Sequence, residues 1–311
     1  MSRIIVTGAA GFIGSHTTDR LLAEGHDVLG IDNLRTGHRH NLEEALKSPK
    51  CRLAIADVAE EGVLDGLVKE FQPDAIIHLA ALVSVQESIE DPDQNLRLNY
   101  IATQRVTTAM EAHGVMRVVF ASSAAIYGDT TDLPIPEDAP KKPVSPYGEA
   151  KWNSEEWLHA RAAQSGFTVR CHRYFNVFGP RQDPASPYSG VISIFDRRYR
   201  DGKPVTIFGD GQQTRDFITV HDVARANVIA ATRPEITSGS ANVCTGNATS
   251  LLDIVNVFAS HYPQVDAPSF AEGREGDIIH SLGCPDRVKE QLGFVAEVPV
   301  ADGLGELIGT G

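Results

Sequence analysis

The sequence predicts an α/β protein in which a doubly wound parallel sheet is followed by a second, smaller α/β domain. Over residues 1–174, short apolar strands alternate with helices, and a glycine-rich turn joins the first strand to the first helix. Beyond residue 174 the alternation weakens, and segments rich in Pro, Gly and Ser take its place. Alternating strands and helices are typical of a parallel sheet with helices on both faces.

The first strand is predicted from a β-branched run that ends at a glycine turn. Residues 3–7 form this run, and a helix extends from residue 12 to about residue 24, where Gly25 is a helix stop. A second strand follows at 26–31, before a polar loop at 32–40. The remaining strands of this region are predicted at 52–55, 75–78, 115–121 and 168–174, and the remaining helices at 60–71, 92–113 and 147–164.

The loops and the weaker second half predict the domain organisation. Five prolines within residues 134–146 indicate an irregular loop. We expect a first domain over residues 1–174 and a second domain mainly over residues 175–311. A helical segment near residues 216–235 is expected to return to the first domain. The sequence shows no internal repeat and no linker-like composition that would divide it further.

Composition excludes several classes of protein. Of the 311 residues, 42% are hydrophobic, which excludes a mostly disordered chain. The formal net charge of −13 argues against general binding of nucleic acid or of an anionic membrane, because the field repels polyanions. The four cysteines are far apart and lack zinc-site spacing, so we expect reduced thiols and no metal. No run reaches the roughly 18 apolar residues of a membrane helix, and we expect a cytoplasmic protein.

A glycine-rich turn with a downstream carboxylate predicts a dinucleotide site of the Rossmann type. Gly8, Gly11 and Gly14 lie between the first strand and the first helix, where they permit a tight turn, close approach to a pyrophosphate and close helix–strand packing. Asp32 follows at the end of the second strand, and a carboxylate there accepts hydrogen bonds from a ribose and repels a 2′-phosphate. NAD is therefore favoured over NADP. Arg35 is a counter-signal, because an arginine near this loop can accommodate a 2′-phosphate.

Three further residues have the chemistry of a proton-transfer site. Tyr147 and Lys151 are four residues apart, so on a helix they share one face. Positive charge from Lys151 and from an oxidised nicotinamide favours the phenolate of Tyr147, whose ordinary pKa near 10 is too high for a base. Ser123 follows a predicted strand at the edge where such folds bind ligands, and its hydroxyl can bond a reacting alcohol. The serine lacks the G-x-S-x-G context of a hydrolase nucleophile.

Together these residues resemble the extended short-chain dehydrogenase/reductase family, and within it the NAD-dependent nucleotide-sugar 4-epimerases of the UDP-glucose/UDP-N-acetylglucosamine type. The resemblance covers nearly the whole chain. It is carried by TGAAGFIGSH at 7–16, DNLRTG at 32–37, HLAALVSVQES at 78–88, SSAAIYG at 122–128, SPYGEAK at 145–151, RYFNVFGPRQ at 173–182, GDGQQTRDFITVHDVA at 209–224 and REGDIIHS at 274–281.

The resemblance implies roles for residues that match the family's motifs. Catalysis falls to Ser123, Tyr147 and Lys151, and the helices near 93–113 and 149–165 are expected to form a homodimer through a four-helix bundle. Asn99, one of the matching cofactor positions, can equally be a helix-packing or capping side chain. The residues expected to bind NAD are Gly8, Gly11, Phe12, Ile13, Gly14, Asp32, Asn33, Asp57, Val58, Leu79, Ala80, Ala81, Asn99, Tyr147, Lys151 and Tyr174.

The substrate implied by the resemblance is a UDP-sugar, whose diphosphate suits arginine side chains because they stay charged and donate in planar pairs. Ser281 matches a gatekeeper position, where a small residue admits a 2-N-acetyl group and a large one such as Tyr excludes it. Neighbouring loops that fill the space would remove this effect. Arg181 is a further, weaker candidate. The residues expected to bind substrate are Ser84, Ser123, Asn176, Arg215, Arg274, Asp277 and Ser281.

The residues after Ser123 favour epimerisation over the sister reactions. Dehydratases of the family carry Asp-Glu at these positions and the decarboxylase branch typically a Glu, whereas this chain has Ala124 and Ala125. The leading hypothesis is a 4-epimerase that acts on UDP-N-acetylglucosamine/UDP-N-acetylgalactosamine and on UDP-glucose/UDP-galactose. Its alternatives are a reductase, dehydrogenase or decarboxylase of the same family and a non-catalytic NAD-binding regulator.

Overall fold

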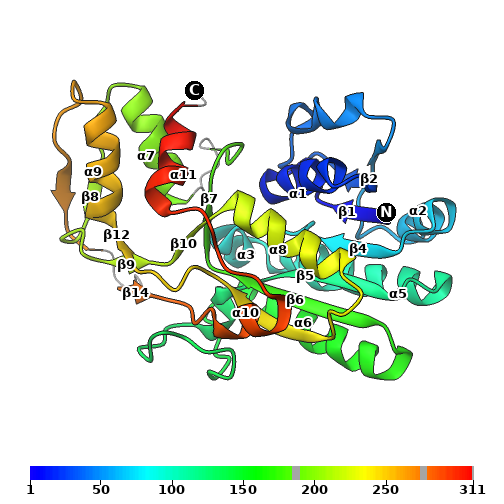
Figure 1. The fold of residues 1–311 in the computed structure, drawn as a ribbon. Coiled ribbons are helices and arrows are strands. Elements are labelled where there is room, and N and C mark those ends of the chain that lie inside the picture. Colours follow the sequence, from blue (N-terminus) through cyan, green and yellow to red (C-terminus); the bar gives the residue numbers. More distant parts are fainter. Residues whose placement is uncertain (184–189, 274–278, 310–311) are drawn as a thin grey trace.

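The computed structural model describes residues 1–183, 190–273 and 279–309 of the protein, and it confirms the predicted fold class (Figure 1). A seven-stranded sheet in the order β11-β6-β5-β4-β1-β2-β3 forms the centre, and all of its pairings are parallel. Its strands are β1 (Arg3–Thr7), β2 (Asp27–Asp32), β3 (Cys51–Ile55), β4 (Ala75–His78), β5 (Arg117–Ser123), β6 (Thr168–Tyr174) and β11 (Gly239–Val243).

Both faces of this sheet are covered by helices, because successive strand residues point to opposite faces. In β1, Ile4 and Val6 pack into one apolar core and Ile5 into another. Figure 1 shows α1 and α8 on one side of the strands and α5 and α6 on the other. The first core includes residues of α1 (Phe12–Ala23) and α8 (Val220–Thr232), and the second includes residues of α2 (Val63–Phe71), α5 (Ala102–His113) and α6 (Pro146–Ser165).

Several boundaries differ from the predicted ones for identifiable reasons. Strands β2 and β5 end one and two residues later than predicted, because Asp32 pairs with Ile55 and Ser123 pairs with Tyr174. Helix α2 begins at Val63 and not at residue 60, since Gly62 before it has a φ of 77°, which no helix accommodates. The other short helices of this region are η1 (Arg39–Leu42), η2 (Ala45–Lys47), α3 (Val85–Glu90), α4 (Pro92–Asn95), the π-helical η3 (Leu96–Ile101) and η4 (Ala124–Tyr127).

A second unit lies beside the sheet, on the left in Figure 1. We use this name for the part of the chain that packs around one apolar core, which includes Phe195, Phe217 and Phe258. Segment 128–145 contains no helix or strand, which confirms the predicted irregular loop. The elements beyond β6, apart from α8 and β11, are β7 (Asn176–Phe178), α7 (Val191–Arg200), β8 (Thr206–Phe208), β9 (Thr214–Arg215), β10 (Phe217–Thr219), β12 (Thr249–Ser250), α9 (Leu251–His261), β13 (Ser269–Ala271), β14 (His280–Ser281), α10 (Asp286–Leu292) and α11 (Val300–Gly309).

The chain returns to the first sheet over a longer segment than the predicted one near 216–235. Helix α8 packs against α1, and β11 then pairs with β6 as the seventh strand. Val288 and Leu292 of α10 also join the core under α1 and α8. The assignment of residues 1–174 and 175–311 to two separate domains stays a prediction.

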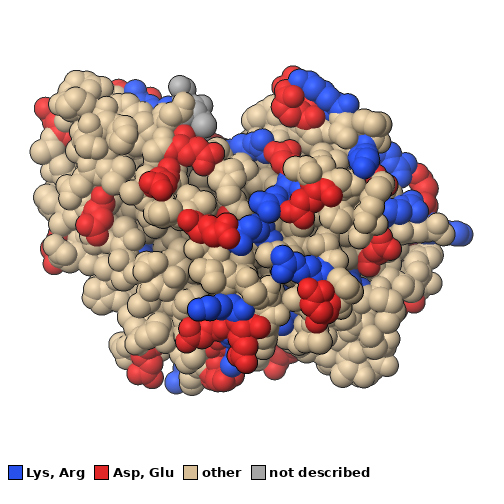
Figure 2. Space-filling model, in the orientation of Figure 1, with Lys and Arg blue, Asp and Glu red and all other residues tan. Residues whose placement is uncertain are grey.

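The visible surface carries charges of both signs, interspersed over most of this face (Figure 2). The face is hollowed at the top, between the second unit and the part that holds α1. Among the described helices, none combines the length and the apolar character that crossing a membrane requires.

Candidate active site

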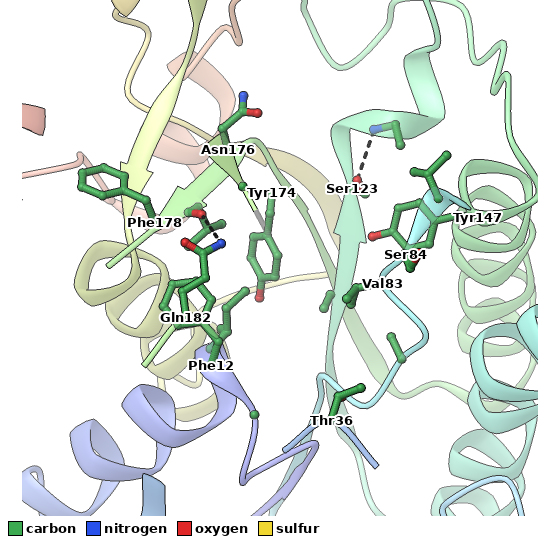
Figure 3. Close-up of a pocket in the computed structure, with 18 of the residues that line it drawn as sticks. Phe12, Thr36, Val83, Ser84, Ser123, Tyr147, Tyr174, Asn176, Phe178 and Gln182 are labelled. Atoms are coloured by element: carbon green, nitrogen blue, oxygen red, sulfur yellow. Dashed lines mark hydrogen bonds between the residues drawn. The ribbon is translucent and has the colours of Figure 1, made fainter. Parts of the chain in front are cut away.

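A cavity of about 1490 Å³ lies at the carboxyl ends of the central strands and extends into the second unit. This edge of a parallel sheet is where doubly wound folds bind their ligands. Ser123, Tyr174 and Asn176 reach the cavity from β5, β6 and β7, as Figure 3 shows, while Phe12 approaches from α1. The cavity therefore brings residues from distant parts of the chain to one place.

The glycine turn forms one end of this cavity. Gly8 has a φ of 70°, and a Cβ on Gly14 would lie 2.0 Å from the Gly8 carbonyl oxygen, so α1 approaches the turn as closely as the sequence predicts. Gly11 occupies the N-cap position and provides no capping side chain. The N–H groups of the first helical turn are thereby directed at the cavity, where they favour an anion.

Asp32 lies directly against the glycine turn. Its Oδ2 accepts a hydrogen bond from the Ala10 N–H at 2.9 Å, and its Oδ1 accepts one from the Leu34 N–H at 2.8 Å. Burial raises the pKa of this carboxyl, and the backbone N–H donors oppose the rise. The carboxylate is held in a fixed position at the cavity wall, as a ribose-binding group requires.

Most of the other residues expected to bind a cofactor line the same cavity, but Asn99 does not. The Asn99 Nδ2 donates to the Leu82 carbonyl at 3.0 Å and to the Asn95 Oδ1 at 2.7 Å, which agrees with the helix-packing alternative. Asp57 is joined to Arg97 by an ion pair of 2.6 Å. The cofactor positions that line the cavity are Gly8, Gly11, Phe12, Ile13, Gly14, Asp32, Asn33, Asp57, Val58, Leu79, Ala80, Ala81, Tyr147, Lys151 and Tyr174.

Tyr147 and Lys151 are presented by the first turns of α6. The Ser145 side chain caps this helix by accepting from the Gly148 N–H at 3.2 Å, and proline at the first helical position suits a helix start. The Tyr147 N–H donates to the Ser88 Oγ at 3.2 Å, which ties α6 to α3. The Lys151 Nζ donates to the Ala121 carbonyl at 2.8 Å and lies 5.8 Å from the centre of the Tyr147 ring.

Ser123 is the last residue of β5, and Figure 3 shows its hydroxyl and that of Tyr147 facing the same space. Burial raises the pKa of Tyr147, and a hydrogen bond with Ser123 opposes the rise. Burial also lowers the pKa of Lys151 to about 7. Burial alone therefore opposes the ionised form of Tyr147 that the sequence predicts. The phenolate depends on positive charge beside the phenol.

Five of the seven expected substrate residues line the cavity: Ser84, Ser123, Asn176, Arg215 and Ser281. Ser281 on β14 pairs in register with Arg215 on β9, so the two residues are neighbours in one small sheet. The Asn176 Nδ2 donates to the Asp216 carbonyl at 3.3 Å. Arg181 also lines the cavity and forms an ion pair of 2.7 Å with Asp19. Arg274 and Asp277 lie outside the described residues.

Asp216 is a structural residue of this site that the sequence analysis missed. Its buried carboxylate accepts from the Thr245 N–H at 2.8 Å, the Gly246 N–H at 2.9 Å and the Gly283 N–H at 3.2 Å. It thereby joins the segment of Arg215 to two loops. The signal was present in TRDF, where Asp216 directly follows the singled-out arginine. The apolar wall formed by Phe178, Phe195 and Phe217 was missed as well.

The cysteine spacing predicts no metal site, and the described residues contain one set of potential ligands outside the cavity. Single ligand atoms of Glu155, His159 and Cys171 lie within 4.8 Å of one another. Glu155 is already bound by Arg173 in a buried ion pair of 2.8 Å. The His159 Nε2 lies 2.9 Å from the Ser240 Oγ, which donates to Glu155. These contacts explain the cluster as a buried hydrogen-bond network.

Comparisons with known proteins identify relatives along nearly the whole chain. The family model described as NAD dependent epimerase/dehydratase family matches residues 4–244. A UDP-glucose 4-epimerase from Mycolicibacterium smegmatis is 38% identical over 309 residues, which cover 98% of this chain and 97% of the relative.

Two solved structures extend the comparison to three dimensions. A UDP-N-acetylglucosamine 4-epimerase from Methanobrevibacter ruminantium, in complex with UDP-N-acetylmuramic acid, matches with a TM-score of 0.93 at 32% identity, covering 99% of this chain and 97% of that one. A UDP-glucose 4-epimerase from Thermus thermophilus in complex with NAD matches with a TM-score of 0.88 at 33% identity, covering 99% of this chain and 98% of that one.

Proposed function

The chain belongs to the NAD dependent epimerase/dehydratase family, and from this membership we propose that it is a UDP-sugar 4-epimerase. It inverts carbon 4 of the sugar by way of a transient 4-keto sugar, so the reaction has no net redox change. One observation carries the proposal: Ser123, Tyr147 and Lys151 line the same cavity as the glycine turn. A cofactor and a sugar alcohol can therefore meet at the proton-transfer group.

The cavity fits NAD, the cofactor of the family. A Cβ on Gly8 would lie 2.8 Å from the Ala80 backbone nitrogen, and a Cβ on Gly14 would lie still closer to the Gly8 carbonyl. Glycine at both positions therefore lets the turn pack tightly against α1 and the segment after β4, which is the compact turn that a dinucleotide pyrophosphate requires. We assign the pyrophosphate to the turn around Gly11 and the adenosine ribose to Asp32. When bound, NAD supplies the acceptor and donor of a hydride.

Tyr147 is the proposed general base and acid. Its hydroxyl takes the proton from the sugar 4-hydroxyl during oxidation and returns it during reduction, and Ser123 orients the reacting oxygen by a hydrogen bond. Lys151, held by the Ala121 carbonyl, contributes positive charge that favours the ionised phenol. The anchored nucleotide lets the 4-keto sugar turn over, so that either face receives the hydride.

The sister reactions of the family need groups that this cavity does not provide near Ser123. The next two residues, Ala124 and Ala125, line the cavity and cannot transfer a proton. Elimination of water from the sugar requires a further acid and base beside Tyr147. This composition favours 4-epimerisation over dehydration or decarboxylation.

For the sugar, we propose that both N-acetylated and non-acetylated UDP-hexoses are substrates. Ser281 lines the cavity with a small side chain, next to Arg215, which we assign to the diphosphate. A small residue leaves volume for a 2-acetamido group that a tyrosine would occupy. Arg274 and Asp277 remain proposed substrate residues on the basis of the resemblance alone.

The test is incubation of the purified protein with UDP-glucose and with UDP-N-acetylglucosamine, without added cofactor. NMR spectroscopy should detect UDP-galactose and UDP-N-acetylgalactosamine, each approaching equilibrium with its substrate. Consumption of added NADH or NADPH in proportion to product would identify a reductase instead, and loss of carbon dioxide from a UDP-uronic acid would identify a decarboxylase. Failure to convert any of these sugars would favour a non-catalytic NAD-binding regulator.

A further inference from the structure

An ion pair between Arg35 and Glu87 connects two segments that line the cavity. Arg35 belongs to the loop after β2, and Glu87 belongs to α3. Figure 3 shows Thr36, the neighbour of Arg35, on the same side of the pocket as Val83 and Ser84, which lead into α3. Neither side chain is fully exposed, with 35% and 21% of the side-chain surface accessible.

Local hydrogen bonds fix the backbone at both ends of this pair. The Arg35 N–H donates to the Asn33 Oδ1 at 3.0 Å, and the Glu87 N–H donates to the Ser84 Oγ at 2.8 Å. The two side chains are 52 residues apart in sequence, so the contact is a product of the fold. These local bonds hold the backbone that carries each side chain, and the ion pair itself joins the guanidinium to the carboxylate.

An arginine at this position has a consequence for cofactor choice. The loop after the second strand of a dinucleotide fold faces the adenosine ribose, and an arginine there binds the 2′-phosphate of NADP. Asp32, at the start of the same loop, repels that phosphate, so the two residues have opposite effects. When a carboxylate binds a guanidinium, the pair as a whole has almost no net charge and attracts a phosphate only weakly. The guanidinium also has fewer N–H donors left for the phosphate oxygens.

We propose that Glu87 is a specificity-determining residue for the cofactor, which binds Arg35 and thereby withholds it from a 2′-phosphate. Discrimination against NADP then has two sources, repulsion by Asp32 and neutralisation of Arg35. Glu87 lies on α3, outside the turn and strand that make up the dinucleotide fingerprint. The proposal rests on NAD being the cofactor and is independent of the identity of the sugar.

The test compares cofactor occupancy in Glu87→Gln and in the unaltered protein. Each full-length protein is equilibrated with equal concentrations of NAD and NADP and freed of unbound nucleotide, and the bound nucleotides are quantified by mass spectrometry after denaturation. We expect the ratio of bound NAD to bound NADP to fall about tenfold in Glu87→Gln, since one charge-assisted contact to the phosphate becomes available. This measurement does not depend on turnover of any sugar, so it distinguishes failure of this proposal from failure of the proposed function.

Two further variants make the outcome specific. Glu90→Gln removes the same charge from the same helix, where Glu90 accepts from the Gln86 Nε2, and it should leave the ratio unchanged. The double variant Arg35→Gln/Glu87→Gln should restore the original ratio, because the freed guanidinium is the group that binds the phosphate. An unchanged ratio in Glu87→Gln overturns the proposal. An equal loss of bound NAD and bound NADP in Glu87→Gln also overturns it. The same holds if the double variant binds as much NADP as Glu87→Gln does.

Discussion

At the scale of single residues, burial moves the pKa values of Tyr147 and Lys151 in opposite directions. It raises the pKa of the phenol and lowers the pKa of the ammonium to about 7, so it favours the neutral form of each group. The pair therefore responds strongly to any charge placed beside it. A base that becomes active only when positive charge is present is suited to a reaction that begins with an oxidised cofactor.

The first prediction concerns the charge of Lys151. Lys151→Met removes the positive charge beside Tyr147, so the pKa of the phenol rises further and the acid limb of the profile of kcat against pH moves to higher pH by at least about one unit. Bound NAD is quantified in parallel, because this side chain is also assigned to the cofactor. Lys142→Met, which alters an exposed lysine of the preceding loop, is the control. An acid limb at the same pH in Lys151→Met would refute the role of this charge.

The second prediction concerns the volume at Ser281. Ser281→Tyr should reduce kcat/KM for UDP-N-acetylglucosamine at least about tenfold relative to UDP-glucose, because the ring and the acetamido group compete for one space. Ser260→Tyr places the same ring on an exposed position of α9 and should leave the ratio unchanged. Undiminished turnover of the N-acetylated sugar in Ser281→Tyr would remove the gatekeeper assignment.

At the scale of elements, the junction of β1 and α1 depends on the absence of a side chain at Gly14. A Cβ there would lie 2.0 Å from the Gly8 carbonyl oxygen and 2.9 Å from the Ala9 Cα, so the helix or the turn must move. The turn cannot move freely, because the Gly8 N–H donates to the Ile31 carbonyl at 2.7 Å. The packing of one helix on one strand thereby sets the shape of the proposed pyrophosphate site.

The third prediction tests this junction. Gly14→Ala should lower the content of bound NAD and destabilise the protein by about 1–3 kcal/mol, as expected for overpacking. Gly66→Ala is the matched control, since a Cβ on this glycine of α2 meets no atom within 4 Å and a helical alanine is favoured by about 1 kcal/mol. The measurements are chemical unfolding and the nucleotide content of the purified protein. If Gly14→Ala binds NAD as the unaltered protein does, the close approach has no functional role.

The elements also show how far a single sequence can predict a site. Within residues 1–174, apolar runs and glycine turns placed the strands to within one or two residues, because these signals are local. Strand ends depend on pairing with a neighbour, so Asp32 and Ser123 became terminal strand residues only in the structure. The contact of Asn99 with Leu82 and the pair of Arg35 with Glu87 join residues 17 and 52 positions apart, and no local pattern predicts them.

At the scale of the whole molecule, the fold class was predicted but the pairing of β11 with β6 was not. Alternation of strands and helices is a local property of the sequence. The pairing of β11 with β6 instead depends on the unpaired backbone N–H and C=O groups at the edge of a sheet that has already formed. The homodimer expected through the helices near 93–113 and 149–165 stays a prediction. Sedimentation of the purified protein would measure its mass.

Buried histidines predict how the stability of the whole molecule depends on pH. Burial lowers the pKa of His16 to about 4 and the pKa values of His78 and His172 to about 3. The unfolded chain, in which these groups titrate near 6.5, therefore binds more protons between about pH 4 and pH 6.5, so stability rises with pH across this window and is lost as pH falls.

The fourth prediction follows from this linkage. The free energy of unfolding should decrease below pH 6.5 by up to about 1.4 kcal/mol per pH unit for each histidine that stays neutral in the folded state. Urea unfolding at pH 5, 6 and 7 measures the slope. His78→Asn should reduce it, whereas His40→Asn, at an exposed position, should not. A free energy that is constant from pH 5 to 7 would contradict the buried, neutral state of these side chains.

The central claim is that Tyr147 transfers the proton of a sugar alcohol beside bound NAD, and kcat of Tyr147→Phe tests it most directly. The variant keeps the ring and removes only the hydroxyl, so it should retain NAD and lose turnover of its UDP-sugar by about 10²–10⁴-fold. Tyr100→Phe, on the π-helical η3 and outside the cavity lining, should keep the original rate. A Tyr147→Phe variant that epimerises at full speed would contradict the account.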